Sequence, residues 1–255
     1  MALIDRIKFI YRAYRYRYRL DKTEIRFLKK NLDTGQVVAD IGTHKGGYLY
    51  WLEKSVGPTG KVYCFEPQRK LFEYLKHIQK VMRYDNVVIE NKGVSSKRGR
   101  QDLLVPRTKS GTSPGAKISN DPKDSEQYDI QKIELVTLDE YFEPAGAFPD
   151  VIKIDAEGHE KDILKGADTV LKHCRMVFME CENRHLDGGS VFDVFEILLE
   201  KGFFGYFFEK NAVRPLDAFR LEQHQKMGDG EFWKNPGYIN NFIFIRGERN
   251  AFLNS

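Results

Sequence analysis

The sequence predicts a doubly wound, Rossmann-like α/β fold: a seven-stranded, mostly parallel sheet with helices on both faces and an antiparallel edge strand. Short apolar runs without alternation, such as residues 37–41 and 151–155, are typical of strands buried on both faces of a parallel sheet. Segments with helical spacing of apolar residues separate most of these runs, and such alternation is typical of βαβ units. We therefore expect one α/β domain over residues 36–250, preceded by a basic helical extension over residues 1–35.

The composition fits one large domain with a full core. The chain has 255 residues, of which 41% are hydrophobic and 31% are charged. The net charge of +4 is unevenly placed, because residues 1–30 carry ten Lys and Arg against three Asp and Glu, whereas the remainder carries 31 against 34. Because the chain after residue 30 is slightly acidic, its charge does not indicate specific nucleic-acid binding.

Cysteine use and hydropathy bear on the location of the protein. Cys64, Cys174 and Cys181 show no metal-ligand spacing, and we interpret them as reduced residues in or near the core of a cytoplasmic protein. No run of about 18 uncharged apolar residues occurs, so we expect no spanning helix. Charges interrupt the apolar residues at the N-terminus, which is unlike a signal peptide.

The N-terminal segment, residues 3–31, is predicted to be helical. Leu3, Ile7 and Ile10 follow helical spacing, but residues 11–20 alternate aromatic residues with Arg, which is a strand-like period. An Arg/Tyr surface could contact a membrane surface, RNA or a second copy of the chain. Alternatively, the tyrosines pack on the main domain with the Arg stems along them.

From residue 36 onward the predicted elements alternate. The expected strands are 37–41, 61–66, 86–91, 151–155, 176–181, 203–208 and 239–245, and the expected helices are 47–56, 68–82, 159–172 and 190–201. The last two strands have no clear helix between them, so we expect them to pair antiparallel at the edge. Residues 106–131, rich in Pro and Gly, are expected to form a lid or a mobile loop, and residues 209–237 a second cover.

A glycine-containing turn after the first strand predicts a nucleoside cofactor. Gly42 permits a sharp turn, and Gly46 or Gly47 lets the following helix press on the strand. Glu66 ends the next strand, where a carboxylate can hold both ribose hydroxyls. The dinucleotide fingerprint fails because position 44 is His, and an acid such as Asp40 suits the positive charges of S-adenosylmethionine. The pattern therefore favours S-adenosylmethionine over NAD.

Five blocks in order and spacing resemble the FkbM-type methyltransferase family over about residues 36–246. They are VADIGTHKGG (38–47), GPTGKVYCFEP (57–67), TLD (137–139), IKIDAEGHE (152–160) and LKGA (164–167). The resemblance implies the class I methyltransferase fold, S-adenosylmethionine as cofactor, and mostly hydroxyl oxygens of sugars, glycolipids or polyketides as acceptors. It further implies that the cofactor is bound by a set of motif residues: Asp40, Gly42, Thr43 and Gly46 near the methionine, Glu66 and Pro67 at the ribose, Gly93 and Val94 within 92–95 at the adenine, and Asp155 near the sulfonium.

Ionisable residues follow the strand at 151–155 and are the candidates for chemistry. An alcohol is a poor nucleophile, so a base or a metal should help to remove its proton. The candidates are Lys153, Asp155, Glu157, His159 and, at the end of the next strand, Glu180. Asp155 is the preferred functional residue, and His159 has a suitable intrinsic pKa for a base.

Several of these candidates have structural alternatives. His159 could cap a helix, Glu157 could favour a helix start, and Lys153 could form a salt bridge. A divalent metal held by acids after both strands, including Glu180, is possible but not favoured. Glu180 and His185 could instead hydrogen-bond sugar hydroxyls, and Asn240 and Asn241, before the last strand, could do the same or simply form a turn.

These features predict an O-methyltransferase that acts on a sugar-containing or other hydroxylated small molecule, such as a glycan or glycolipid. The protein is expected in the cytoplasm, with possible peripheral membrane or homodimer contact through residues 3–31. The rivals are an RNA or protein methyltransferase, a non-catalytic S-adenosylmethionine-binding scaffold and, less favoured, a dehydrogenase.

Overall fold

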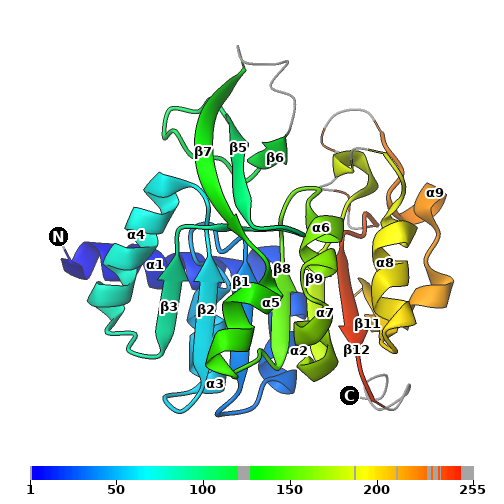
Figure 1. Ribbon diagram of the computed structural model, residues 1–255, viewed down its shortest axis with the longest axis horizontal. Coiled ribbons are helices and arrows are strands. Elements are labelled where there is room, and N and C mark those ends of the chain that lie inside the picture. The colour runs from blue at the N-terminus through cyan, green and yellow to red at the C-terminus, as the bar shows by residue number, and fades with distance from the viewer. Residues whose placement is uncertain are drawn as a thin grey trace.

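The computed structural model describes residues 2–119, 127–186, 188–210, 212–228, 231, 235 and 237–247. Its centre is an eight-stranded sheet covered by helices on both faces (Figure 1). The strand order is β11-β10-β12-β9-β8-β1-β2-β3. The bounds are β1 (Val37–Ile41), β2 (Lys61–Phe65), β3 (Val87–Glu90), β8 (Val151–Ile154), β9 (Met176–Glu180), β10 (Phe204–Glu209), β11 (Ala212–Pro215) and β12 (Asn241–Ile245).

The predicted α/β fold is confirmed, with one strand more than expected. Strands β9, β8, β1, β2 and β3 pair parallel, and β12 pairs antiparallel with both β9 and β10, as predicted for the edge. The extra strand is β11, which pairs antiparallel with β10 at the sheet edge. Its four residues, Ala-Val-Arg-Pro, are too short and too exposed to produce an apolar signal in the sequence.

Helices on the two faces bury two separate apolar cores. One face carries α1 (Ala2–Arg15), α2 (Lys22–Asn31), α3 (Leu49–Val56) and α4 (Arg69–Met82). The other carries α5 (Leu138–Phe142), α6 (Glu160–Lys165), α7 (Asp168–His173), α8 (Val191–Glu200) and α9 (Leu221–His224). The helix predicted over 159–172 is divided at Gly166, where a Cβ would overlap the carbonyl oxygen of Ser95. Three short 3₁₀ turns, Glu143–Ala145, Asn183–His185 and Leu216–Ala218, connect elements.

The Pro- and Gly-rich region contains a second sheet rather than a plain lid or loop. This sheet has the order β4-β7-β5-β6 and stands beyond one end of the main sheet (Figure 1). Its strands are β4 (Gly93–Val94), β5 (Gly99–Pro106), β6 (Lys117–Ser119) and β7 (Tyr128–Val136). A small core of Leu103, Val105, Ile133 and Leu135 holds it together. The prediction for 106–131 was therefore wrong where β6 and the start of β7 lie, because turn residues obscured the strands; residues 107–116 form a connection, and residues 120–126 lie outside the described residues.

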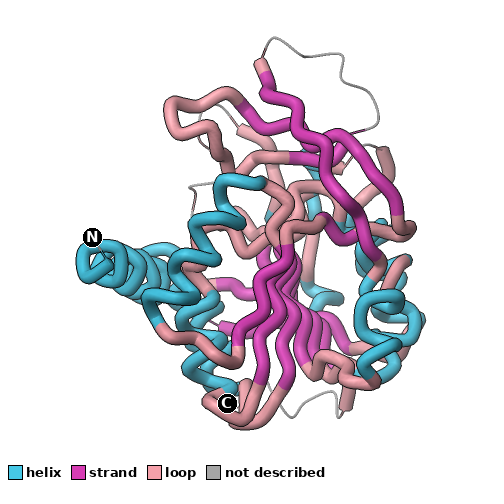
Figure 2. Tube along the Cα trace, turned by 60° about the vertical axis from the view of Figure 1, so that its left-hand side comes forward, coloured by secondary structure: helices cyan, strands magenta, loops and turns pink. Residues whose placement is uncertain are grey.

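The N-terminal extension is helical, as predicted, but it is not one continuous helix. After α1, a π-helical turn (Tyr16–Leu20) widens the helix, and the chain breaks at Asp21 before α2 begins. Phe9 and Ala13 are fully buried against the main domain. In Figure 2, the amino end of α1 stands out from the body of the molecule.

Candidate active site

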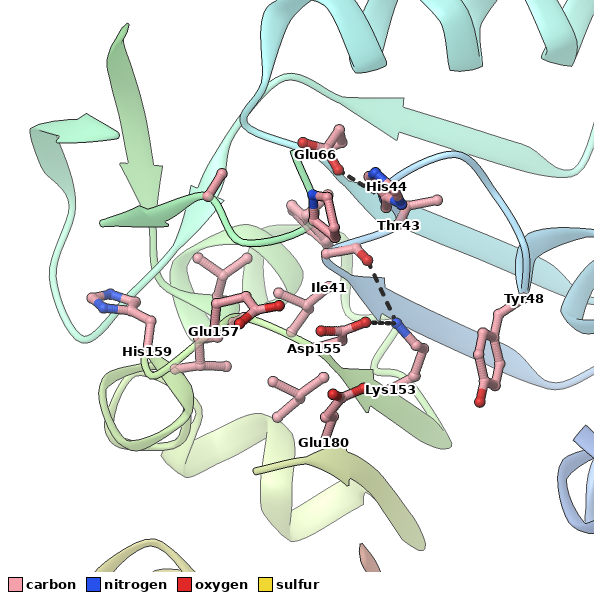
Figure 3. Close-up of a pocket in the computed structure, with 18 of the residues that line it drawn as sticks. Ile41, Thr43, His44, Tyr48, Glu66, Lys153, Asp155, Glu157, His159 and Glu180 are labelled. Atoms are coloured by element: carbon pink, nitrogen blue, oxygen red, sulfur yellow. Dashed lines mark hydrogen bonds and ion pairs between the residues drawn. The ribbon is translucent and has the colours of Figure 1, made fainter. Parts of the chain in front are cut away.

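A cavity of about 600 Å³ lies at the carboxyl ends of β1, β2, β8 and β9. This is the expected position for a ligand site in an open α/β sheet. Its walls come from four parts of the chain: the strand ends, the small sheet, the segment before β12 and the N-terminal extension. Figure 3 shows the residues on the strand-end side, with Asp155 near the middle and Glu66, His159 and Tyr48 around it.

Gly42 determines the shape of the turn after β1. Its φ of 77° lies in the left-handed region, and a Cβ there would overlap the carbonyl oxygen of Asp155. Only glycine combines this conformation with so close an approach of two strand ends. The buried Thr43 then closes the turn, because its Oγ1 donates to the carbonyl oxygen of Asp40 at 3.0 Å. Gly42 and Thr43 both line the cavity.

Two other predicted cofactor residues lie behind the cavity wall. Asp40 is fully buried, and its carboxylate lies 3.2 Å from the Nζ of Lys153. Gly46 has a φ of 73°, and a Cβ there would lie 2.8 Å from the ring of Phe9. Among the described residues that line the cavity, neither Asp40 nor Gly46 is present. The second glycine therefore makes room for α1, which the sequence did not indicate.

Glu66 lines the cavity as expected and is held by backbone amides. Its Oε2 accepts from the amide of His44 at 2.8 Å, and its Oε1 accepts from the amide of Gln68 at 2.9 Å. Burial raises the pKa of Glu66 to about 7. The carboxylate is thereby fixed in place and keeps lone pairs for further donors. Pro67 also lines the cavity.

The next stretch of the cavity is formed by Gly93 and Val94 of β4, together with Lys92. His159 belongs to this side, because its Nε2 lies 2.9 Å from the Oγ of Ser95. Burial lowers the pKa of His159. In Figure 3, Glu157 separates His159 from the group formed by Asp155 and Lys153. The structure thus holds the predicted base apart from Asp155 and Lys153.

Lys153 is an internal cation shared by two carboxylates. Its Nζ lies 3.2 Å from Asp40 Oδ1 and 3.6 Å from Asp155 Oδ2, and it donates to the carbonyl oxygen of Gly42 at 3.5 Å. Burial alone would lower the pKa of Lys153, but attraction to Asp40 and Asp155 outweighs it and raises the pKa above its ordinary value. A permanently charged lysine is a poor base, so its geometry fits the salt-bridge alternative. Lys153 connects the turn of Gly42 to Asp155.

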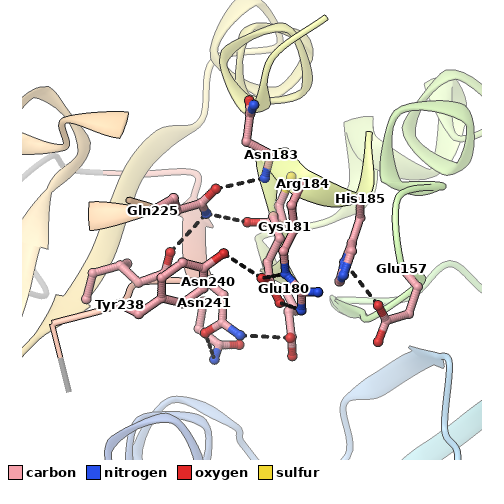
Figure 4. A network of polar contacts seen from close by, with 12 residues as sticks. Glu157, Glu180, Cys181, Asn183, Arg184, His185, Gln225, Tyr238, Asn240 and Asn241 are labelled. Atoms are coloured by element: carbon pink, nitrogen blue, oxygen red, sulfur yellow. Dashed lines mark hydrogen bonds and ion pairs between the residues drawn. The ribbon is translucent and has the colours of Figure 1, made fainter. Parts of the chain in front are cut away.

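Glu180 and its neighbours form a polar wall on the far side of Asp155. Glu180 Oε1 accepts from the side-chain amide of Asn240 at 2.8 Å, and Asn241 donates to Asn240 at 3.1 Å. Burial and then repulsion from Asp155 and Glu157 raise the pKa of Glu180 well above its ordinary value. Figure 4 shows this network together with the ion pair between His185 Nδ1 and Glu157 Oε2, which lie 3.0 Å apart.

Gln225 holds this wall in position. Its side-chain amide donates to the carbonyl oxygens of Cys181 and Ile239 at 2.8 and 2.9 Å, and its Oε1 accepts from the amide of Asn183 (Figure 4). It therefore fixes the segments that carry Glu180 and Asn240. Gln225 lies within the cover predicted for 209–237; parts of that cover, residues 211, 229–230, 232–234 and 236, lie outside the described residues.

The N-terminal extension supplies cavity residues that sequence reasoning missed. Tyr16, Leu20, Asp21 and Glu24 line the cavity beside Tyr48. Burial raises the pKa of Asp21 to about 6, against the opposing effect of its hydrogen bond with Tyr48, and burial raises the pKa of Glu24 to about 7. The only signal in the sequence was the rarity of acids in this basic segment. The extension is therefore a wall of the site as well as an appendage.

Within the described residues, no three His, Cys, Asp or Glu side chains are grouped so that they could hold a metal ion. The same part of the chain contains no helix with the length and hydrophobicity needed to cross a bilayer. Cys64, Cys174 and Cys181 are buried free thiols, as the sequence analysis expected of core residues.

The sequence profile of the Methyltransferase FkbM domain matches residues 40–227, which is well over half of the chain. The chain belongs to the FkbM methyltransferase family. This confirms the resemblance drawn from the five motifs, and it gives the chain its coarse class, an S-adenosylmethionine-dependent methyltransferase.

A solved structure of the family shows the same fold. The methyltransferase FkbM from Methylobacillus flagellatus KT superposes with a TM-score of 0.54 at 14% identity, over 91% of this chain and 47% of that one. This chain thus spans about half the length of that relative. A SAM-dependent methyltransferase from Aquifex aeolicus gives a TM-score of 0.45 at 19% identity, over 76% of this chain and 86% of that one. A search of curated proteins found no match.

Proposed function

We propose that this FkbM methyltransferase transfers a methyl group to a hydroxyl oxygen of a small acceptor, such as a sugar, glycan or glycolipid. One observation carries the proposal: a single cavity has two chemically different ends that meet at Asp155. One end is formed by backbone turns and by the carboxylate of Glu66, which main-chain amides hold in place. The other end is lined by carboxylates, side-chain amides and tyrosines, which are the groups that bind hydroxyls.

The first end fits the cofactor of the family. Glu66 has both oxygens oriented by backbone amides and still faces the cavity, so it suits the two ribose hydroxyls. Gly42 and Thr43 would border the methionine part, and Gly93 and Val94 the adenine. When bound there, S-adenosylmethionine supplies an electrophilic methyl carbon on a positively charged sulfur.

The second end would hold the acceptor. Asn240 and Asn241 carry amides, Tyr48 a phenol and Glu180 a carboxylate, all on the cavity wall. Such groups can orient a polyhydroxylated molecule so that one oxygen faces the cofactor, and positioning supplies much of the rate of a displacement. We assign removal of the hydroxyl proton to Asp155. Its side chain is one-third exposed, and Lys153 holds one of its oxygens at 3.6 Å.

A two-part experiment tests this function. Calorimetric titration with S-adenosylhomocysteine and, separately, with NAD⁺ identifies the cofactor, and Glu66→Ala should abolish binding of the thioether. Glu140→Ala, an exposed carboxylate elsewhere, is the matched control and should bind like the wild type. Methylation of a panel of sugars and glycolipids is then measured for the wild type and Asp155→Asn.

Asp155→Asn should keep S-adenosylhomocysteine binding and lose about 100-fold or more in turnover, because a lost general base typically costs that much. Binding of NAD⁺ in place of the thioether would refute the cofactor assignment. Turnover of RNA or of a protein, with none of any hydroxylated small molecule, would refute the acceptor class. We place this activity in the cytoplasm, which the buried free thiols support.

A further inference from the structure

Helix α1 and the π-helical turn that follows it present a continuous apolar stripe to the outside of the molecule. The stripe consists of Leu3, Ile4, Ile7, Tyr11, Tyr14 and Tyr18, whose exposed fractions range from 43% to 69%. These residues recur at intervals of three and four, so they share one side of the helix. The opposite side carries the fully buried Phe9 and Ala13. The helix therefore has one apolar side for the body and a second that is largely exposed, with Tyr14 alone of the stripe contacting the rings of Tyr50 and Trp51 among the described residues.

Exposed cations flank the stripe. At 100° per residue, Lys8 and Arg15 fall on one flank of α1 and Arg6 on the other, and all three are exposed. The one acid of this segment, Asp5, turns towards the body and lies 3.0 Å from the Nε2 of His77. The outward side from residue 2 to residue 20 thus combines apolar and cationic groups without a carboxylate.

We infer that α1 lies on the surface of an anionic membrane, with the aliphatic residues inserted among the lipids and the flanking cations on the headgroup phosphates. An apolar stripe bordered by Lys and Arg is the arrangement with which helices bind in the plane of such a surface. Each cation near an anionic leaflet adds to the attraction. This inference goes beyond the proposed function, because it does not depend on what the cavity methylates.

The order of residues along the stripe supports a lipid occupant. Leu3, Ile4 and Ile7 lie towards the amino end, which stands out from the body (Figure 2), and the tyrosines lie nearer the body. Aliphatic side chains suit the acyl region, whereas tyrosines suit the level of the headgroups. RNA bases would bind by stacking on aromatic rings. Leu3, Ile4 and Ile7 have no ring on which a base could stack.

Charge argues against a second copy of the chain as the occupant. Two copies paired through this stripe would bring Lys8 and Arg15 of each helix against the same cations of the other. Like charges at close range destabilise such a pair, and there is no carboxylate on the outward side to compensate them. An anionic surface has the opposite charge and needs no complementary shape.

The same segment leads into the cavity. The helical extension continues from the stripe to Leu20, which is 49% exposed and also lines the cavity, and then to Asp21 and Glu24 on the cavity wall. A membrane that contacts α1 would therefore lie beside the acceptor end. Together with the proposed function, on which this step rests, the geometry favours an acceptor carried by a lipid, such as a glycolipid.

Co-sedimentation of the full chain with vesicles tests the inference. We expect binding to vesicles of equal parts phosphatidylcholine and phosphatidylglycerol, little binding to pure phosphatidylcholine, and weaker binding as salt increases. Lys8→Glu with Arg15→Glu should weaken binding by about 25-fold or more, at roughly fivefold per cation. Arg98→Glu with Lys165→Glu changes the net charge equally at exposed positions elsewhere and should bind like the wild type.

A second pair of variants tests the apolar contribution. Leu3→Ser with Ile7→Ser should weaken vesicle binding by about 100-fold, since both side chains leave the lipid. Leu199→Ser with Met227→Ser removes two exposed apolar side chains elsewhere and is the control. All four positions are exposed, so circular dichroism should show unchanged folding.

Three results would overturn the inference: no binding of the wild type to anionic vesicles, equal losses in variants and controls, or a dimer in light scattering that Leu3→Ser with Ile7→Ser dissociates. RNA binding without vesicle binding is one form of the first result. Calorimetry with S-adenosylhomocysteine reports separately on the cavity. Failure of the proposed function is therefore distinguishable from failure of membrane binding.

Discussion

The two ends of the cavity are built in different ways. The cofactor end depends on backbone: the left-handed turn at Gly42, and two main-chain amides that hold Glu66. The acceptor end depends on side chains from distant segments, with Asp21, Tyr48 and Asn240 meeting on one wall. A site made by local turns can therefore be found in the sequence as a short motif, whereas a site made by tertiary contacts leaves no local pattern in the sequence.

The two ends also differ in electrostatics. At the cofactor end, the carboxylate of Glu66 is hydrogen-bonded to amides, and the cation Lys153, which contacts the turn of Gly42, is paired with Asp40. At the acceptor end, burial raises the pKa values of Asp21 and Glu24 to about 6 and 7. Burial thus raises carboxyl pKa values at both ends, because that of Glu66 is also raised to about 7; the ends differ in that main-chain amides hold both oxygens of Glu66.

The largest expected effect concerns the backbone turn. Gly42→Ala should destabilise the protein by about 3 kcal/mol or more and abolish S-adenosylhomocysteine binding, because the new Cβ meets the carbonyl of Asp155 in a left-handed conformation. Urea unfolding and calorimetry measure both effects. Gly99→Ala, where a Cβ has open space, should change stability by about 0.5 kcal/mol or less. Equal stabilities for the two variants would show that the turn is not the rigid part of the site.

The internal cation comes next. Lys153→Met should cost about 3–5 kcal/mol of unfolding free energy, because it leaves the buried carboxylate of Asp40 unpaired. The double variant Asp40→Leu with Lys153→Met should recover much of this loss. Lys132→Met breaks an exposed pair with Asp102 and should cost about 1 kcal/mol or less. A loss for Lys153→Met no greater than for Lys132→Met would mean that the buried pair contributes nothing.

The acceptor end predicts a pH dependence of stability. A raised carboxyl pKa means that the folded protein binds the proton more tightly than the unfolded chain, so this stability is present at acid pH and is lost as pH rises towards about 7. Glu24→Gln should therefore be more stable than the wild type at about pH 8, by about 1–3 kcal/mol, and should match it near pH 4. Urea unfolding across this range measures the difference. Glu140→Gln, an exposed control, should show the same dependence of unfolding free energy on pH as the wild type. If Glu24→Gln showed that same dependence, the raised pKa of Glu24 would be excluded.

The smallest effect is expected at His159. Because this side chain contacts Ser95 and lies apart from Asp155, His159→Gln should change turnover by less than about threefold, compared with 100-fold or more for a lost base. Loss of the contact with Ser95 should cost about 1 kcal/mol of stability. Steady-state kinetics with an acceptor identified from the panel decide between the roles. A 100-fold fall in kcat for His159→Gln would restore the histidine as the base.

Local patterns were sufficient for the central sheet and the cofactor end. The strand predicted at 37–41 has those bounds, and β10 and β12 pair antiparallel, as the missing helix between them indicated, although β11 forms the edge. Gly42 and Glu66 could be found because turn geometry and strand ends impose residue types at fixed spacing. The helix predicted over 159–172 was wrong as one element, since the break at Gly166 comes from contact with Ser95, about 70 residues earlier in the chain.

The sequence by itself determined the α/β class, the family and the turn that begins the site, because these follow from periodicity and from backbone constraints within a few residues. Only the tertiary structure decided the rest. It placed Gly46 against Phe9, separated His159 from Asp155, and made Asp21 and Glu24 part of the cavity wall. Such contacts join residues far apart in the chain, and their energies depend on burial and on neighbouring charges, which no local pattern records.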